Sequence, residues 1–467
     1  MTVELALTLA IGGAALAIAI RSPFHAFCVF LAALPFEDAL SLRGALKITP
    51  AHLALLTLVG VCLVHPRRRQ IHGSVATPLT PFLLAYVGVA ALSLVMTIFV
   101  PPPSITATTE LLRVRASEYR GLLQFALLVF SAMAFFLTLF FCSDPRRLRF
   151  AVGLLGVVSG VVALYAIFQM VGVWGRVPLV GSYAAGLYEQ PASLRPNATF
   201  QEPMLFGHFL LAGLPLVTTL FLQRRSLGAA ECRFYGWPGA ALIVVMVVAL
   251  ILTISRAAWI GAAASSLVIL ALSPKAARTR SLLLFGLVAI LGLAAFVVAM
   301  GSPLNAWHTV VNRFSLSAPS LAAEQRLWYQ GFLLELAAQY PLLGVGLGNY
   351  PLYQLARFDS YGIAGAYGVY WQALVETGLL GFASLILLLF AALRVPRVAL
   401  TAIGETSPWR PYLAGCIASM TGLFVGHLFL GDRLGLHVWV LLGIAAGAAH
   451  VSATAAVPTP TPATVRQ

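Results

Sequence analysis

The chain has 467 residues, of which 60% are hydrophobic and only 9% are charged. Soluble domains carry about a quarter charged residues, so this composition excludes an ordinary soluble protein and indicates a membrane protein. The net charge of +14 would suit a nucleic-acid partner, but the basic residues gather in short segments between apolar runs. We therefore interpret the charge as a signal of membrane topology and expect no nucleic-acid binding.

Apolar segments long enough to cross a hydrocarbon core of about 30 Å as helices recur along the whole chain. The thirteen candidates cover residues 4–21, 23–40, 50–65, 79–100, 121–142, 149–173, 204–222, 237–254, 257–273, 281–300, 367–393, 410–430 and 435–451. The second is the weakest because it contains Pro35, Glu37 and Asp38, and if it is short or re-entrant the count falls to twelve. No segment shows the alternation of a membrane β-barrel. The predicted fold class is an all-α polytopic membrane protein with about 12–13 transmembrane helices.

Basic residues cluster in every second connecting segment. The clusters lie at residues 67–69, 146–149, 224–233, 275–280 and 394–410. Because basic loops stay on the cytoplasmic side, the segments 101–120, 174–203 and 301–366 and the turn at Ser255 face outward. We expect one transmembrane domain over residues 1–456, with 301–366 as a long outer loop, and a disordered tail at 457–467. A connecting segment as long as 301–366 usually carries function.

Arg256 lies in the sequence TISRAAWI, between two apolar segments and on the predicted outer face. An ionisable side chain at membrane depth is costly unless it is paired or lines a wet cavity, so Arg256 is a candidate functional residue. The structural alternative is an arginine that snorkels to the membrane surface. We favour function because Ser255 and Trp259 would give Arg256 a polar and aromatic lining.

Arg326, in the sequence EQRLW, opens an amphipathic stretch of the outer loop. Alone it would be an exposed charge on a surface helix. With Arg256 on the same face, however, two guanidinium groups would suit the oxygens of a phosphate or pyrophosphate. Arg176 and Arg195 could join them from the segment 174–203.

Residues 341–350 read PLLGVGLGNY and contain Gly344, Gly346 and Gly348. A dinucleotide loop needs a βαβ unit, which the surrounding sequence does not predict. We therefore predict a tight loop or close backbone packing at these glycines. Further along, Glu376 lies within an apolar segment, either as a paired structural carboxylate or as a site residue.

Four motifs recur in a fixed order along the chain. They are RPNATFQEP at 195–203, TISRAAWIG at 253–261, Arg326-x-Trp328 followed by the loop 341–350, and YWQALVETGLLG at 370–381. This series resembles the superfamily of O-antigen ligases and polysaccharide polymerases, over about residues 195–381. Ala198 stands where glycine is usual in the first motif.

The resemblance implies a membrane glycosyltransferase of the C type, whose donor glycan is carried on undecaprenyl pyrophosphate. Transfer would occur on the periplasmic face of the bacterial inner membrane, with the loop 301–366 in the periplasm and without metal or other cofactor. Arg256 and Arg326 would bind the pyrophosphate and stabilise charge on the leaving group, and apolar grooves between helices would hold the polyprenyl chain. The partners are the lipid-linked glycan, membrane lipid and other polysaccharide assembly proteins.

One departure from the family concerns the general base. Family ligases carry a histidine–asparagine pair where this chain has Tyr367 and Gly368, and tyrosine is a weak base at neutral pH. Either Glu376, Glu324 or His308 replaces the histidine, or positioning and leaving-group stabilisation suffice. His208, His427 and His437 also lie close to the predicted outer face.

The function we predict is that of a polysaccharide polymerase, with an O-antigen ligase or protein O-oligosaccharyltransferase as the alternative acceptor chemistry. A lipid-linked glycan transporter is an alternative of a different class, and a structural scaffold is a third. The predicted catalytic residues are Arg256, Arg326, Glu376 and Tyr367. The predicted substrate-binding residues are Arg195, Trp259, Trp328, Tyr370 and Gln372.

Overall fold

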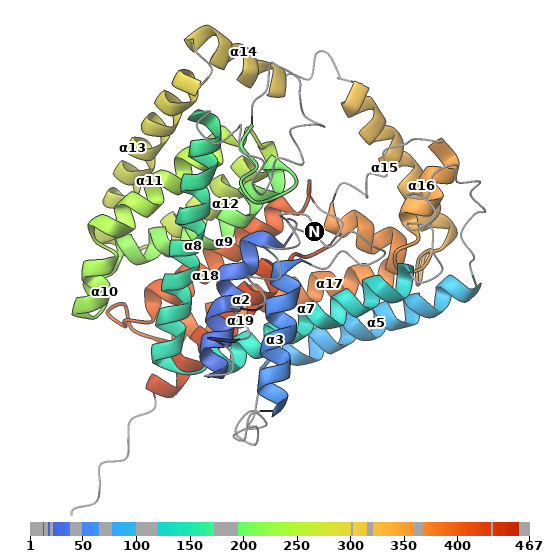
Figure 1. The fold of residues 1–467 in the computed structure, drawn as a ribbon, viewed down its shortest axis with the longest axis horizontal. Coiled ribbons are helices and arrows are strands. Elements are labelled where there is room, and N and C mark those ends of the chain that lie inside the picture. The colour runs from blue at the N-terminus through green and yellow to red at the C-terminus, as the bar shows by residue number, and fades with distance from the viewer. Residues whose placement is uncertain are drawn as a thin grey trace, which may run out of the picture.

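The computed structural model describes the chain in blocks separated by gaps. The described residues are 13, 17–18, 22–37, 49–64, 77–99, 120–171, 195–299, 302–314, 321–358, 368–430 and 433–456. Within these blocks every regular element is a helix (Figure 1). Most of the predicted first span at 4–21 and the predicted tail at 457–467 lie outside the described residues.

The helices follow one another along the chain with short connections. They are α2 (Pro23–Ala33), η1 (Leu34–Phe36), α3 (Pro50–Val64), α5 (Thr80–Phe99), α7 (Arg120–Cys142), α8 (Pro145–Val171), α9 (Pro203–Leu222), η3 (Arg224–Ser226), α10 (Ala229–Phe234), α11 (Trp237–Leu252), α12 (Arg256–Leu272), α13 (Lys275–Ala299), α14 (Pro303–Phe314), α15 (Leu321–Gln339), α16 (Tyr350–Phe358), α17 (Val369–Ala402), α18 (Arg410–Gly426) and α19 (Leu436–Ala456).

Six helices in the described part of the chain are long and apolar enough to cross a membrane, namely α5, α7, α8, α9, α17 and α19. Four shorter apolar segments accompany them, formed by α2 with η1, by α3, by α11 and by α12. The prediction of an all-α polytopic membrane protein is confirmed. The second predicted span is indeed short, since α2 has 11 residues and a 3₁₀ turn follows it at Pro35.

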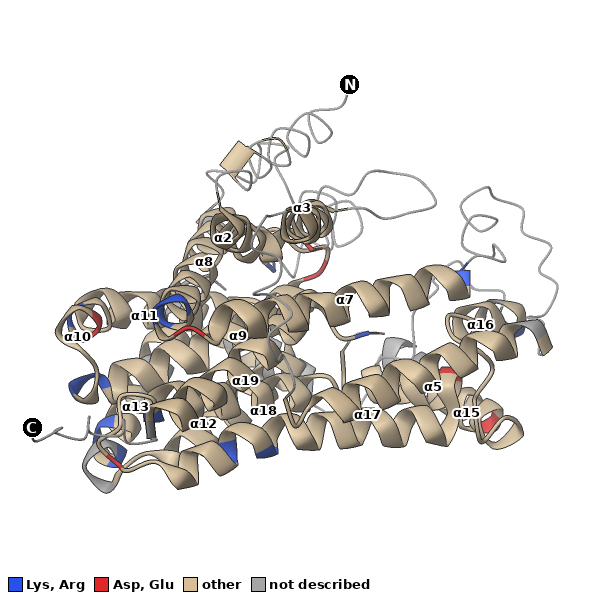
Figure 2. Ribbon diagram, turned by 90° about the horizontal axis from the view of Figure 1, so that it is seen from below, with Lys and Arg blue, Asp and Glu red and all other residues tan. Residues whose placement is uncertain are grey.

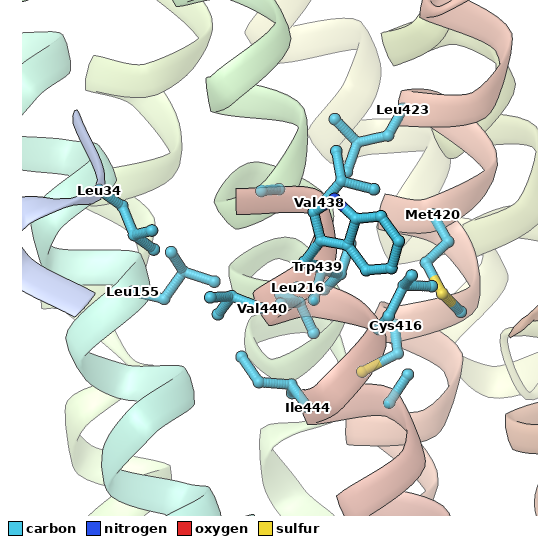
Figure 3. Close-up of a cluster of buried hydrophobic side chains, with 14 of the residues drawn as sticks. Leu34, Leu155, Leu216, Cys416, Met420, Leu423, Val438, Trp439, Val440 and Ile444 are labelled. Carbon is cyan, nitrogen blue, oxygen red and sulfur yellow. The ribbon is translucent and has the colours of Figure 1, made fainter. Parts of the chain in front are cut away.

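The centre of the bundle consists of α9, α18 and α19. Of the apolar window in α9, 89% is buried inside the protein, so other helices surround this one on nearly all sides. Helix α18 packs against α12 and α9, and α19 packs against α7. Figure 3 shows Trp439 of α19 at the core of this region, between Val438, Met420 and Leu423.

One end of the bundle joins three connecting segments through side-chain contacts. Arg149 Nε, near the start of α8, lies 3.5 Å from Glu231 Oε1 of α10, and its guanidinium lies 4.8 Å from the ring of Trp409 before α18. Figure 2 shows basic residues gathered around α10 at this end. These loops thus lie together at one end of the bundle, as the alternation of charge predicts.

The predicted outer loop 301–366 contains three helices among its described residues. Helix α14 continues from α13, and α15 and α16 pack against α17. Figure 1 shows α14 between the α13 side of the molecule and the side that holds α15 and α16. The long segment therefore carries helical structure of its own.

Candidate functional site

The loop 341–350 fits into a break in α17. At Gly378 the backbone of α17 leaves helical geometry, with φ 66°. The amides of Val345 and Gly346 donate hydrogen bonds to the carbonyl oxygens of Val375 (2.9 Å) and Glu376 (3.1 Å). In return, the Leu379 amide donates to the Pro341 carbonyl over 2.7 Å. The second half of the outer-loop motif and the motif at 370–381 therefore form one interlocked unit.

Glycine is required where these two motifs touch. Gly344, Gly346 and Gly348 have φ values of 68°, 96° and 80°, which side chains rarely adopt. A β-carbon on Gly344 would lie 2.4 Å from the Glu376 carbonyl carbon. The prediction of a tight loop with close backbone packing is confirmed.

The interlocked unit forms one wall of a polar cavity of about 70 Å³. Its polar lining residues are Glu37, His52, Tyr86, Gln124, Ser131, Gln372, Glu376, Thr377 and Arg433. Two carboxylates, an arginine and several hydroxyl and amide groups thus converge in a chain of which only 9% is charged. We call this space the polar cavity.

Glu376 is held in place from two directions. Gln372 Nε2, one turn earlier on α17, donates to Glu376 Oε1 over 2.6 Å, and Ser93 of α5 donates to the Glu376 carbonyl over 2.7 Å. Glu376 is 5% exposed. Both predicted residues on this segment therefore lie at the cavity, and Glu376 is a hydrogen-bonded carboxylate that also lines a site.

Two predicted arginines meet at the start of α12. Arg195 Nε donates to the Thr253 carbonyl over 2.7 Å, and Arg256 is the first residue of the helix, with an exposed side chain. Ser255 caps this helix by accepting from the Ala258 amide. The positive end of the helix dipole and the arginines make this corner suitable for an anion. We call it the arginine corner.

The segment that carries Arg195 is fastened on both sides. Gln169 of α8 accepts from the Ala198 amide (2.8 Å) and donates to the Ala198 carbonyl (3.2 Å). Thr199 Oγ1 donates to the Pro35 carbonyl over 2.6 Å, two residues before Glu37. The segment therefore connects the arginine corner to the polar cavity.

Ala198 has φ 49°, so the position where the related motif has glycine adopts a left-handed conformation. A side chain costs about 1–2 kcal/mol there. We expect Ala198→Gly to stabilise the protein by up to about 1 kcal/mol, because the relieved strain is partly offset by the greater chain entropy of glycine. Denaturation midpoints in detergent measure the change. Ala294→Gly, on the exposed face of α13, should instead destabilise by about 0.5–1 kcal/mol, and equal losses in both variants would contradict the prediction.

A second, apolar pocket of about 250 Å³ lies between α9, α11, α12 and α13. Its lining residues are Leu214, Pro215, Thr218, Ile243, Val247, Leu250, Ile251, Trp259, Ala262, Ser265, Ser266, Ile269 and Leu284. Trp259 Nε1 donates to the Leu250 carbonyl over 3.2 Å. The expected lining of Arg256 thus divides, because Ser255 caps α12 while Trp259 faces this apolar pocket.

The other predicted site residues are spread more widely. The Tyr370 hydroxyl donates to the Phe424 carbonyl over 2.7 Å and so ties α17 to α18. Trp328, on α15, is 71% exposed. Arg326 is in the same helix, but its side chain lies outside the described part of the structure, as does Tyr367. His308 is exposed on α14.

The polar cavity also contains residues that were not predicted as site residues. Glu37 and Arg433 line it from opposite ends of the chain. The only sequence signal for Glu37 was a carboxylate at the end of an apolar segment, and the same signal singled out Glu376. No three His, Cys, Asp or Glu side chains in the described blocks are placed to hold a metal ion, and the expected independence of metal stays a prediction.

Comparison with known families adds one finding. Residues 209–386 match the family model described as O-antigen ligase. The match includes the motifs at 253–261, 326–350 and 370–381, and it confirms the resemblance that these motifs carry. Members of this family are membrane glycosyltransferase-like enzymes. A comparison with curated proteins finds no match.

Proposed function

From the O-antigen ligase domain at residues 209–386, we propose that the chain is a polysaccharide polymerase of the bacterial inner membrane. Its donor is a growing glycan on undecaprenyl pyrophosphate, and its acceptor is a single lipid-linked repeat unit. The acceptor hydroxyl attacks the anomeric carbon of the donor, and undecaprenyl pyrophosphate leaves. The reaction takes place at the periplasmic end of the bundle.

The observation that carries this proposal is the position of Arg256 relative to the apolar pocket. The residues of α12 that line the pocket recur at helical spacing from Trp259 to Ile269, and Arg256 continues this stripe one turn toward the N-terminus of the helix. A cationic helix end thus precedes an apolar surface on the same helix face. A pyrophosphate with a long hydrocarbon tail has the matching chemistry, since fixed cations bind the head and apolar side chains contact the tail.

The polar cavity is suited to an acceptor sugar. Carboxylate and amide side chains such as Glu376, Gln372 and Gln124 accept and donate hydrogen bonds to hydroxyl groups. The fastened segment 195–200 connects this cavity to the arginine corner. This arrangement supports a bimolecular transfer, in which donor head and acceptor hydroxyl are brought together.

The acceptor distinguishes a polymerase from a ligase. Tyr367 stands where related ligases carry histidine, which favours the polymerase. A ligase or protein O-oligosaccharyltransferase would use the same donor with a different acceptor, and a lipid-linked glycan transporter would move its substrate without breaking a covalent bond.

Reconstitution of the purified protein in lipid vesicles tests the proposal. With undecaprenyl-pyrophosphate repeat units alone, we expect a ladder of longer glycans on a gel and release of free undecaprenyl pyrophosphate. Product that forms only after addition of a lipid A-core or protein acceptor would overturn the polymerase in favour of a ligase. Translocation of unchanged substrate, with no new glycosidic bond, would instead identify a transporter.

A further inference from the structure

A chain of buried ionisable side chains runs behind the polar cavity. His437 Nδ1 of α19 lies 3.3 Å from Glu37 Oε2, and His437 Nε2 lies 3.2 Å from His208 Nδ1 of α9. The ring of His427, at the end of α18, lies 4.1 Å from that of His208. All four side chains are buried. We call Glu37, His437 and His208 the proton chain.

The Leu423 carbonyl determines where protons lie in this chain. It accepts from His208 Nε2 over 3.0 Å and from His427 Nδ1 over 2.8 Å, so both nitrogens carry hydrogen. A neutral His208 then has a lone pair on Nδ1, and His437 Nε2 must donate to it. In a neutral His437 this leaves a lone pair on Nδ1, directed at the Glu37 carboxylate.

All contacts of the proton chain are hydrogen bonds only when it holds one proton more than a carboxylate and two neutral imidazoles. Without that proton, two acceptors face each other, either between His208 and His437 or between His437 and Glu37. A group that gains a hydrogen bond on protonation is a proton acceptor. The arrangement therefore favours uptake of one proton.

Two glycines leave space for the chain. A β-carbon on Gly435 would lie 2.8 Å from His437 Nδ1 and 3.1 Å from Glu37 Oε2. A β-carbon on Gly426 would lie 2.8 Å from His208 Cδ2 and 3.8 Å from the carbonyl oxygen of Ala257, the residue after Arg256. The chain thus extends from the polar cavity to the first turn of α12.

Other charged and titratable groups adjoin the chain where Glu37 lines the cavity. They are Arg433 before α19, Glu376 on α17, His52 on α3 and Tyr86 on α5. The Leu436 amide donates to Glu37 Oε1 over 2.8 Å. Arg433 and this amide stabilise a carboxylate at Glu37, so a proton taken up there can pass to His437.

We infer that the proton chain is the general base of glycan transfer, with Glu37 as the group that receives the proton and His437 and His208 as positioning residues that share it. This inference rests on the proposed function. As the acceptor oxygen bonds to the anomeric carbon, its proton moves to Glu37. The electron pair of the breaking bond leaves with the pyrophosphate at the arginine corner. The proton chain then releases its proton to water before the next turnover.

The test measures the rate of glycan transfer against pH in vesicles. The base must be unloaded to accept a proton, so the wild-type rate should rise with pH and then level off. Glu37→Gln and His437→Gln should lower the rate at neutral pH by about 10²–10⁴-fold and remove the plateau. Gly435→Ala, which displaces the pair without altering an ionisable group, should change the profile in the same direction.

Matched controls separate this role from a structural one. Glu335→Gln on α15 and His308→Gln on α14 change exposed groups of the same types and should keep the wild-type profile. Thermal melting establishes that each variant is folded. Folded Glu37 and His437 variants whose rates change by one factor at every pH would overturn the inference, as would unchanged rates. A wild-type protein that transfers no glycan would instead overturn the proposed function.

Discussion

Arg256→Ala should lower the rate of glycan transfer by at least about 100-fold while the protein stays folded. The guanidinium lies at the N-terminus of α12, where it would stabilise charge on the departing pyrophosphate, and removal of one such fixed donor costs about 10²–10³ in rate. Arg256→Lys should fall between the two, because it keeps the charge but loses the planar fork. The gel assay with undecaprenyl-pyrophosphate repeat units measures the rates.

The control for this prediction is another exposed arginine of the same domain. Arg357→Ala, on α16, should leave the rate within a factor of about three of wild type, since a surface charge away from the chemistry contributes little. Arg326→Ala should resemble Arg256→Ala, and the double variant should lose less than the sum of the two effects if both arginines act on one pyrophosphate. A folded Arg256→Ala protein with wild-type transfer would remove Arg256 from the mechanism.

The helices could be predicted from the sequence because long apolar runs determine where they begin and end. The segment predicted at 204–222 is α9, Pro203–Leu222, and the segment predicted at 121–142 is α7, Arg120–Cys142. The short second segment followed from Pro35 and the acidic residues after it. The break in α17 was not predicted, since a glycine in an apolar run does not reveal that a loop fits against it.

The candidate site could be predicted only where its residues lie close together in the sequence. Gln372 and Glu376 are one helical turn apart, and both line the polar cavity. Glu37 and His437, by contrast, are 400 residues apart in the chain, and only the packing of α19 near the end of α2 brings them into contact. Trp259 was placed beside a polar site because the helical face it occupies depends on α9, α11 and α13.

Gly378→Ala should separate the two interlocked motifs and have the largest effect on stability. Its φ of 66° is unfavourable for alanine, and the β-carbon would lie 2.3 Å from the Leu342 carbonyl oxygen. Either the strained conformation is kept or the hydrogen bonds between loop and helix are lost. We expect a loss of roughly 3–5 kcal/mol, measured by denaturation in detergent, with loss of glycan transfer because the Gln372–Glu376 pair moves with the helix.

Gly331→Ala is the matched control for this substitution. Gly331 lies within α15, and nothing lies within 4 Å of the position of its β-carbon. Alanine should therefore stabilise this helix by up to about 1 kcal/mol and leave transfer unchanged. If Gly378→Ala were as stable and active as Gly331→Ala, the contact between loop 341–350 and α17 would not hold the cavity wall. A destabilised Gly378→Ala beside an active Gly331→Ala would show that close backbone packing of the two motifs, at a point where a methyl group does not fit, positions Glu376.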